Sequence, residues 1–374
     1  MQPSLTQPFG TAPADKDLAS QDPEPAAQIA PNPQKSEREA KSTLLSGSML
    51  AGMAMGAAIG IGVAGRVGAV VGASLGAVVG ALGGATAGAT ASPTTMDGAS
   101  VAETASTAPV RLHIEDSGGR GRPLVLIHGW PLSVQAWEPQ VAVLQAAGYR
   151  VVAYDRRGFG RSDKPESGYN YDTLADDLQY VMDHCGLQDA TLVGFSMGGG
   201  EVARYITRHG ESRLHSVVFA AAVPPYLMQT ADNPDGPLTP EKARQGLEAL
   251  AQDRNAFFDH FTRDFFSAQG VLQVTESQRS EALAVCHQSA PHAALACMEA
   301  FGATDFREDL KRVTVPTLVV HGEADVIVPI AGSGLRTHHA VRHSQFVKVS
   351  GAPHGMNLSH AQVFNDALLS FLRP

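Results

Sequence analysis

The chain has 374 residues, of which 44% are hydrophobic and 6% aromatic, and its formal net charge is −9 at pH 7. This length allows one large domain or two ordinary ones, and the negative charge argues against a nucleic-acid partner. The three cysteines are odd in number and widely spaced, so they imply neither a disulfide framework nor a metal site. A reducing compartment such as the cytoplasm is therefore acceptable.

The N-terminal segment, residues 1–43, is rich in Pro, Ala, Gln and charged residues and shows no hydrophobic period. This composition predicts disorder. The first apolar stretch begins only near Met49, farther from the start than the apolar region of a cleaved signal peptide. We therefore expect no signal peptide at this end of the chain.

The next segment, residues 44–91, carries glycine at every fourth position from Gly52 to Gly88, with Ala64 as the exception. On a helix this spacing forms a stripe without side chains, against which a second helix can pack closely in a bilayer. Arg66 separates two uncharged stretches of about 25 Å and 37 Å at helical rise. The segment resembles the glycine-zipper family of membrane-associated helical hairpins. A flexible Gly/Ala spacer is the alternative.

After a Ser/Thr/Ala-rich linker at 92–109, the remainder from 110 to 374 alternates strand-like and helix-like patterns. This alternation predicts an α/β fold with a mostly parallel sheet and helices on both faces. Asp172 is the expected N-cap of one of these helices. The expected strands are 110–115 at the outer edge, 124–127, 151–154, 190–195, 217–222, 316–321 and 345–349.

The strand pattern stops between about 224 and 310. Thr239 followed by Pro240 is a typical helix start, and Thr275 with Gln278 forms a potential capping box. We therefore expect an all-helical cap over the C-terminal edge of the sheet. The phenylalanines of this region are expected to form the core of the cap. A last helix, 359–372, closes the fold.

The candidate nucleophile is Ser196, in the sequence Gly194-Phe-Ser-Met-Gly198 at the end of an apolar run. Glycines two positions away on each side fit a nucleophile elbow, a strand-to-helix turn so tight that a Cβ at these positions would clash. The turn exposes the Ser196 hydroxyl, and the following helix, from Met197, directs free backbone N–H groups toward it. Since this motif also arises by chance in glycine-rich chains, an acid and a histidine must follow in that order.

Asp325 and His354 supply that order, because Asp325 comes after the strand ending at residue 321 and His354 comes after the last strand. A parallel sheet gathers its functional loops at the ends of its strands. His354 would take the serine proton and return it to the leaving group, while Asp325 fixes the imidazole tautomer and stabilises the imidazolium. Glu323 is the alternative acid.

The oxyanion of such a reaction needs backbone donors, and the N–H groups of Met197 and Trp130 are the candidates. Pro131, which follows Trp130, has no N–H. The charged segment 155–162 is expected to be a structural turn with ion pairs rather than a catalytic element. Four further histidines are possible metal ligands. His338, His339 and His343 are expected at a solvated helix end and His360 on the surface, because a metal site would need carboxylates or a defined spacing.

Six motifs together resemble the cofactor-free, non-heme chloroperoxidases and related aryl esterases of the α/β-hydrolase superfamily. They are His128-Gly-Trp-Pro131, Tyr154-Asp-Arg-Arg-Gly-Phe-Gly-Arg-Ser162, Gly194-Phe-Ser-Met-Gly-Gly-Gly-Glu201, Ala220-Ala-Ala-Val-Pro-Pro225, Thr304-Asp-Phe-Arg307 and Gly351-Ala-Pro-His354. The resemblance spans residues 110–374. It implies a serine esterase without a metal or cofactor that also acts as a perhydrolase, making a peracid from a carboxylic acid and hydrogen peroxide. In that family a proline after the oxyanion-loop tryptophan accompanies perhydrolysis, and Pro131 fits.

Two further interpretations stay open at this point. Within enzymes, the chain is a lactonase or a plain carboxylesterase without peroxide chemistry. A hypothesis from another functional class is a membrane-interaction protein that acts through residues 49–91. Helix–helix association through this segment, or a homo-oligomer, would then be expected. The favoured hypothesis is a cytoplasmic serine hydrolase for small carboxylic esters, associated with a membrane through this segment.

Overall fold

The computed structural model describes residues 110–373 of the chain. The predicted disordered segment, glycine-zipper segment and linker all lie outside the described residues. Within 110–373, no helix combines the length and the hydropathy that crossing a bilayer requires.

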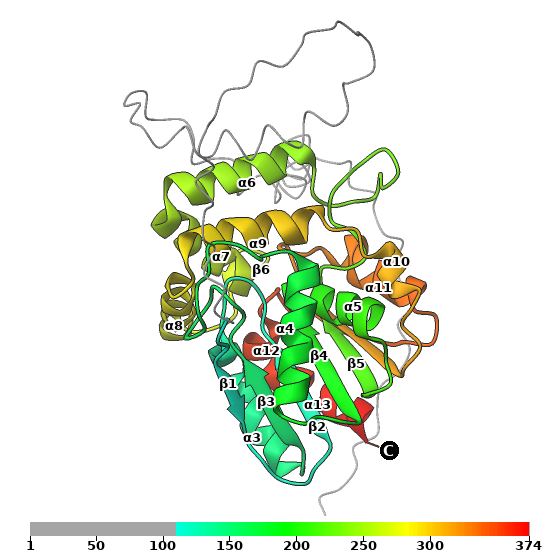
Figure 1. Ribbon diagram of the computed structural model, residues 1–374. Coiled ribbons are helices and arrows are strands. Elements are labelled where there is room, and N and C mark those ends of the chain that lie inside the picture. The colour runs from blue at the N-terminus through cyan, green and yellow to red at the C-terminus, as the bar shows by residue number, and fades with distance from the viewer. Residues whose placement is uncertain (1–109, 374) are drawn as a thin grey trace, which may run out of the picture. The chain divides into compact units, whose positions relative to one another are not determined.

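A seven-stranded sheet forms the centre of the described region, in the order β1-β3-β2-β4-β5-β8-β9 (Figure 1). All neighbouring strands pair in parallel except the edge strand β1, which runs antiparallel to β3. The predicted fold class, a mostly parallel sheet in an α/β fold, is confirmed. The strands are β1 (Ile114–Asp116), β2 (Pro123–Ile127), β3 (Arg150–Tyr154), β4 (Ala190–Phe195), β5 (Leu214–Ala220), β8 (Thr317–Gly322) and β9 (Gln345–Val349).

The central strands consist of apolar runs because helices cover both faces of the sheet. Every residue of β4 and of β8 is buried. The register places Ile127 beside Gly194, and Gly194 beside Phe219, so that β2, β4 and β5 end close together. The loops that follow these strands therefore meet at one edge of the sheet.

Two layers of helices enclose the sheet (Figure 1). In the orientation of Figure 1, α4 and α5 lie in front of the sheet, and α3, α12 and α13 lie behind it. Helix α10 packs against α5 and α11, and α11 packs against β8. Their bounds are α3 (Glu138–Ala146), α4 (Tyr171–His184), α5 (Met197–His209), α10 (Arg307–Leu310), α11 (Gly334–Ala340), α12 (Met356–Ser359) and α13 (Ala361–Leu372).

Between β5 and β8 the chain forms the cap, with four longer helices. These are α6 (Pro240–Gln252), α7 (Arg254–Phe266), α8 (Glu276–His287) and α9 (Pro291–Ala303). Both predicted helix starts are present: Thr239 caps α6, and Thr275 forms a complete capping box with Gln278 at the start of α8.

The expectation of an all-helical cap is wrong in one place. A short antiparallel hairpin, β6 (Ser267–Ala268) and β7 (Val271–Leu272), connects α7 to α8. Its two turn residues, Gln269 and Gly270, both have positive φ angles, 52° and 78°. A two-residue turn with this backbone matches the twist of a hairpin, which is why these four residues pair.

The starts of two elements also differ from the prediction. Helix α4 begins at Tyr171 because Asn170, not Asp172, caps it and accepts the N–H of Thr173 at 3.0 Å. The outer strand starts late, at Ile114. Residues before it bond instead to the loop at 155–163.

The last helical segment is divided as well. Helix α12 ends at Ser359 and α13 begins at Ala361, with His360 between them in a non-helical conformation.

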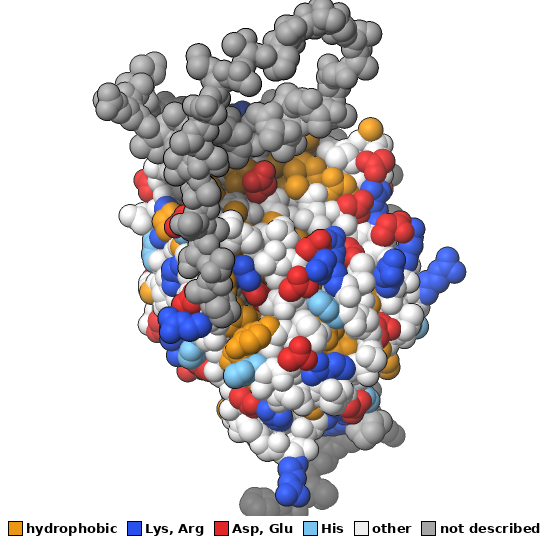
Figure 2. All heavy atoms as spheres, in the orientation of Figure 1, with side chains coloured by type: hydrophobic (Ala, Val, Ile, Leu, Met, Phe, Trp, Pro, Cys, Tyr) orange, Lys and Arg blue, Asp and Glu red, His pale blue; other side chains and the backbone are white. Residues whose placement is uncertain are grey.

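Charged side chains of both signs lie next to each other on the face drawn in Figure 2. Between α4 and α5, Arg208 pairs with Asp176 at 2.8 Å and with Asp172 at 3.4 Å. Such exposed or half-exposed pairs contribute little to stability. Most of the stability of the fold therefore comes from burial of its apolar core.

Candidate active site

The turn between β4 and α5 carries Ser196 with φ 56° and ψ −118°, a conformation that non-glycine residues rarely adopt. A Cβ on Gly194 would lie 2.5 Å from the carbonyl oxygen of Gly198. The N–H of Ser196 donates to the carbonyl of Ala220 at 2.8 Å, which ties the turn to β5. The geometry is that of the predicted nucleophile elbow.

Ser196, His354 and Asp325 lie in one hydrogen-bonded row. His354 Nε2 is 2.9 Å from Ser196 Oγ, and His354 Nδ1 is 2.6 Å from Asp325 Oδ2. An ionised carboxylate only accepts hydrogen bonds, so Nδ1 carries the proton and Nε2 is free to accept the serine hydroxyl. The three predicted residues are therefore brought together, although they are separated by up to 158 positions in the chain.

Asp325 is fully buried, and its charge is balanced by its neighbours. Its other oxygen, Oδ1, accepts the backbone N–H groups of Ile327 at 2.9 Å and Val328 at 2.8 Å. Burial raises the pKa of Asp325, but the imidazoles of His354 and His321 outweigh it and lower the pKa to about 2. The carboxylate is therefore ionised at every pH at which the protein would be assayed.

The two predicted oxyanion donors lie on either side of the nucleophile. A Cβ on Gly129 would come within 3.0 Å of Ser196 Cβ, so the loop that carries Trp130 packs directly against the elbow. In the described part of the chain, the backbone N–H groups of Trp130 and Met197 donate to no other group. Both are thus available to an anion beside Ser196.

The side chain of Trp130 connects this loop to the cap. Its indole N–H donates to the carbonyl of Ala294 on α9 at 2.9 Å. Its ring is surrounded edge-on by four phenylalanines at centroid distances of 5.2–6.2 Å, namely Phe257, Phe258 and Phe261 of α7 and Phe301 of α9. Cap packing therefore fixes the position of one candidate oxyanion donor.

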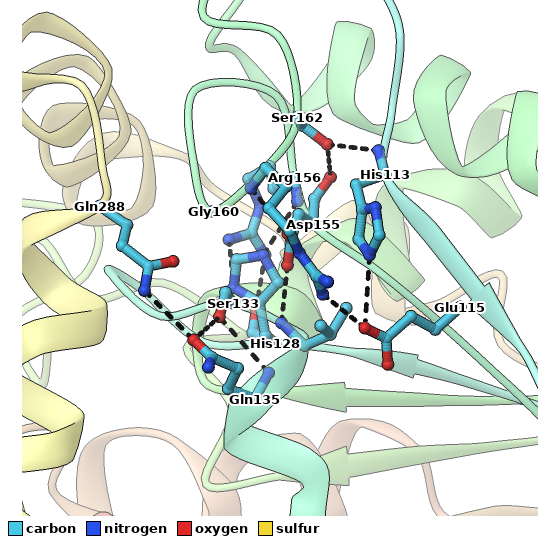
Figure 3. A network of polar contacts seen from close by, with 12 residues as sticks. His113, Glu115, His128, Ser133, Gln135, Asp155, Arg156, Gly160, Ser162 and Gln288 are labelled. Atoms are coloured by element: carbon cyan, nitrogen blue, oxygen red, sulfur yellow. Dashed lines mark hydrogen bonds and ion pairs between the residues drawn. The ribbon is translucent and has the colours of Figure 1, made fainter.

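The charged segment at 155–162 contacts the same loop, as Figure 3 shows. Asp155 accepts the N–H of Val134 at 2.8 Å and, through its other oxygen, the N–H of Arg161 at 2.8 Å. Ser162 joins this turn to the chain before β1 through the N–H of His113. These contacts are those of a structural turn, as the sequence predicts.

Arg156 extends this support to the nucleophile helix. It is buried and donates to the carbonyl of His128 at 2.6 Å (Figure 3). It also donates to Glu201 of α5 at 2.6 Å. Its backbone N–H donates to His128 Nε2 at 2.9 Å. Burial and the nearby Arg156 lower the pKa of His128 well below its usual value, which keeps that ring neutral and able to accept.

The other sequence candidates lie away from the row. Glu323, the alternative acid, points outward and accepts from Lys348 and from Ser350 at 2.9 Å. His338 contacts Ser344 at 2.8 Å, and His360 contacts Ser359 at 3.0 Å. Among residues 110–373, no group of His, Cys, Asp and Glu is arranged to hold a metal ion.

Sequence reasoning missed the cap residue that contacts the base. Phe265 of α7 packs edge-on against the His354 ring at 5.0 Å, and Phe195, which also contacts Phe265, packs against the same ring at 5.2 Å. From the sequence, Phe265 is expected in the core of the cap, with a place in the ligand pocket as the alternative. The spacing of Phe258, Phe261 and Phe265 on one helical face was the available indication.

The fold and this site agree with a known family. The family model described as the alpha/beta hydrolase fold matches residues 122–361. The chain belongs to the α/β-hydrolase family. Among similar proteins of this family, a putative non-heme chloroperoxidase from Synechocystis sp. is 42% identical over 271 residues, which is 72% of this chain and 97% of the relative.

Two other α/β-hydrolases extend the comparison. A bifunctional esterase/perhydrolase from Acinetobacter calcoaceticus is 36% identical over 71% of this chain and 96% of its own length. The crystal structure of a bromoperoxidase from Bacillus anthracis is 48% identical, with a TM-score of 0.70, and covers 72% of this chain and 97% of that protein. The predicted class, an enzyme of the chloroperoxidase and esterase group of α/β-hydrolases, is confirmed.

The anchoring of Trp130 by the cap can be tested against Trp137, the second tryptophan. Both side chains are buried, but the indole N–H of Trp137 finds no acceptor among the described residues. Trp130→Phe should lower the free energy of unfolding by about 1 kcal/mol more than Trp137→Phe, because only the former loses a buried hydrogen bond. Urea unfolding of the two variants measures the difference. Equal losses would contradict the assignment.

Proposed function

We propose that Ser196, His354 and Asp325 are the catalytic triad of an acyl-transfer enzyme that hydrolyses small carboxylic esters. The observation that supports this most is the row of contacts at 2.9 Å and 2.6 Å that joins the three side chains under the elbow. A serine hydroxyl needs a base within hydrogen-bond reach to attack a carbonyl. His354 is that base, and Asp325 orients it.

The reaction proceeds through two tetrahedral intermediates. Ser196 Oγ attacks the ester carbonyl as His354 takes its proton, and the backbone N–H groups of Trp130 and Met197 bind the oxyanion. His354 then protonates the departing alcohol, which leaves an acyl group on Ser196. Water attacks this acyl-enzyme by the same steps in reverse and releases the carboxylic acid.

The same acyl-enzyme supports perhydrolysis when hydrogen peroxide replaces water. The peroxide oxygen attacks the acyl carbonyl, Ser196 leaves with a proton from His354, and the product is a peracid. The peracid then oxidises a halide in solution and returns to the carboxylic acid. The names of the esterase/perhydrolase and chloroperoxidase relatives favour this second activity for the chain.

Substrate size follows from how closed the site is. Ser196 exposes 6% of its surface and His354 exposes 1%, with Phe265 against the imidazole. A carbonyl must therefore reach Ser196 along a narrow approach, which favours a short acyl group such as acetyl. Lactones meet the same requirement and remain the alternative substrates.

The triad assignment predicts large and selective losses of hydrolysis. Ser196→Ala and Asp325→Asn should each lower kcat for p-nitrophenyl acetate by about 10⁴-fold or more. Glu323→Gln is the matched control, because that carboxylate is exposed and faces away from His354. A Ser196→Ala enzyme with wild-type turnover, or a Glu323→Gln enzyme as inactive as Asp325→Asn, would contradict the assignment.

A second assay separates the ester, lactone and peroxide activities. The purified chain is given an aryl acetate, a lactone, or acetate with hydrogen peroxide, with bromide and a bromination dye as the reporter in the last case. We expect ester hydrolysis to dominate and bromination to require acetate, since the peracid is made from it. Comparable bromination without acetate would overturn the peracid route.

We also propose, from the sequence pattern alone, that residues 49–91 attach the enzyme to a membrane, where helix–helix contacts would pair two chains. This function and hydrolysis are separable. The full-length Ser196→Ala chain should lose hydrolysis and still float with phosphatidylglycerol vesicles in a density gradient. If the wild-type chain stays at the bottom of the gradient, the membrane proposal is wrong and the enzymatic one is unaffected.

A further inference from the structure

A second histidine contacts the acid of the proposed triad. His321 is the fifth residue of β8, directly before the turn that carries Asp325, and its side chain is fully buried. The sequence analysis treated it only as the end of a strand. The hydrolysis steps above assign no role to His321, and neither does the family comparison.

The contacts of His321 decide where its proton lies. Its Nε2 is 2.8 Å from the carbonyl oxygen of Val328, which only accepts hydrogen bonds. Nε2 therefore carries a hydrogen. The same atom is 3.2 Å from Asp325 Oδ2, the oxygen that also receives His354 Nδ1 at 2.6 Å. Asp325 Oδ2 thus accepts from His354 and has His321 Nε2 as a second, longer contact.

The opposite edge of the His321 ring is held by packing. Its Nδ1 has no polar partner among the described residues, and a Cβ on Gly334 would come within 2.5 Å of it. A second proton on Nδ1 would have no acceptor in this buried position, which is costly. The ring is therefore held with its Nε2 edge against the Val328 carbonyl and Asp325.

We propose that His321 is a positioning residue for hydrolysis: its Nε2–H donates to the Val328 carbonyl while Nε2 lies 3.2 Å from Asp325 Oδ2, and this nearby N–H limits how strongly that carboxylate holds a proton on His354. The proposal rests on the proposed function of the triad. With Ile327 and Val328 donating to Oδ1, the carboxylate is contacted by N–H groups on both oxygens. His321 shares Oδ2 with the base.

Removing this N–H has a predictable direction. Oδ2 would retain one donor, its negative charge would act more strongly on His354, and the imidazolium would become more stable in the free enzyme. Since attack needs neutral His354, the acid limb of the pH profile of kcat/KM would move to higher pH.

The titratable groups that face the Asp325 carboxylate are few. They are His321 from β8 and His354 from the loop after β9. Helix α11 contributes Gly334, which carries no charge, at the far edge of the His321 ring. Glu323, on the same turn as Asp325, is exposed and paired with Lys348. A shift of the acid limb therefore reports on the pair of histidines around Asp325.

Two substitutions in the full-length chain test the proposal. In His321→Gln the side-chain amide N–H₂ reaches about as far as the imidazole Nε2–H, whereas His321→Met fills a similar volume without a donor. The readout is the pH profile of kcat/KM for p-nitrophenyl acetate. We expect the acid limb to rise by roughly 0.5–1 pH unit in the Met variant and to stay in place in the Gln variant. A Met variant with the wild-type limb, or a Gln variant that shifts as far as Met, would overturn the proposal.

A measurement on the unmodified chain covers the case in which the Met variant does not fold. Spectra of the protein labelled with ¹⁵N-histidine report the tautomer of each ring, and the resonance that disappears in His321→Gln identifies residue 321. The proposal requires a proton on Nε2 and none on Nδ1. A proton on Nδ1 would overturn it. If Ser196→Ala retains hydrolysis, the proposed function itself is wrong. Neither of the His321 experiments can give that result, so the two failures are distinguishable.

Discussion

The structure depends on one constraint, the meeting of three loop residues at one edge of a parallel sheet. Because β4, β8 and β9 run in parallel, the residues that follow them converge, and Ser196, Asp325 and His354 come within hydrogen-bond distance. In the proposed mechanism, the ionised carboxylate fixes the imidazole tautomer, and the imidazole Nε2 then takes the proton of the serine hydroxyl. The chemistry is therefore a consequence of strand direction.

The cap is more than a cover over this edge. Trp130, which offers one oxyanion donor, is held by an α9 carbonyl and by phenylalanines of α7, and α7 also places Phe265 against His354. The buried Arg156 links the same loop to Glu201 on the nucleophile helix. The oxyanion loop is thus fixed from the cap and from the sheet together, which is the kind of preorganisation that oxyanion stabilisation requires.

Much of this could be predicted because the strands and the elbow leave local patterns. The apolar runs of the strands and the glycines around Ser196 are local patterns that the sequence shows directly. The order of acid and base along the chain is visible in the same way. The missing features are non-local or rest on small differences. Asn170 and Asp172 are both good N-cap residues, and in the structure the helix begins directly after Asn170. The hairpin at Gln269-Gly270 lacks the usual Asn-Gly pair. The contact of His321 with Asp325 depends on how a turn closes, which spacing along the chain does not encode.

The central claim is that Ser196 is the residue that forms the covalent intermediate. Incubation of the full-length chain with a fluorophosphonate, followed by intact mass measurement and peptide mapping, tests it directly. The account predicts one phosphonyl group per chain, on Ser196, and no labelling after heat denaturation. Stoichiometric labelling of another residue, or a native protein that hydrolyses aryl acetates and stays unlabelled, would contradict it.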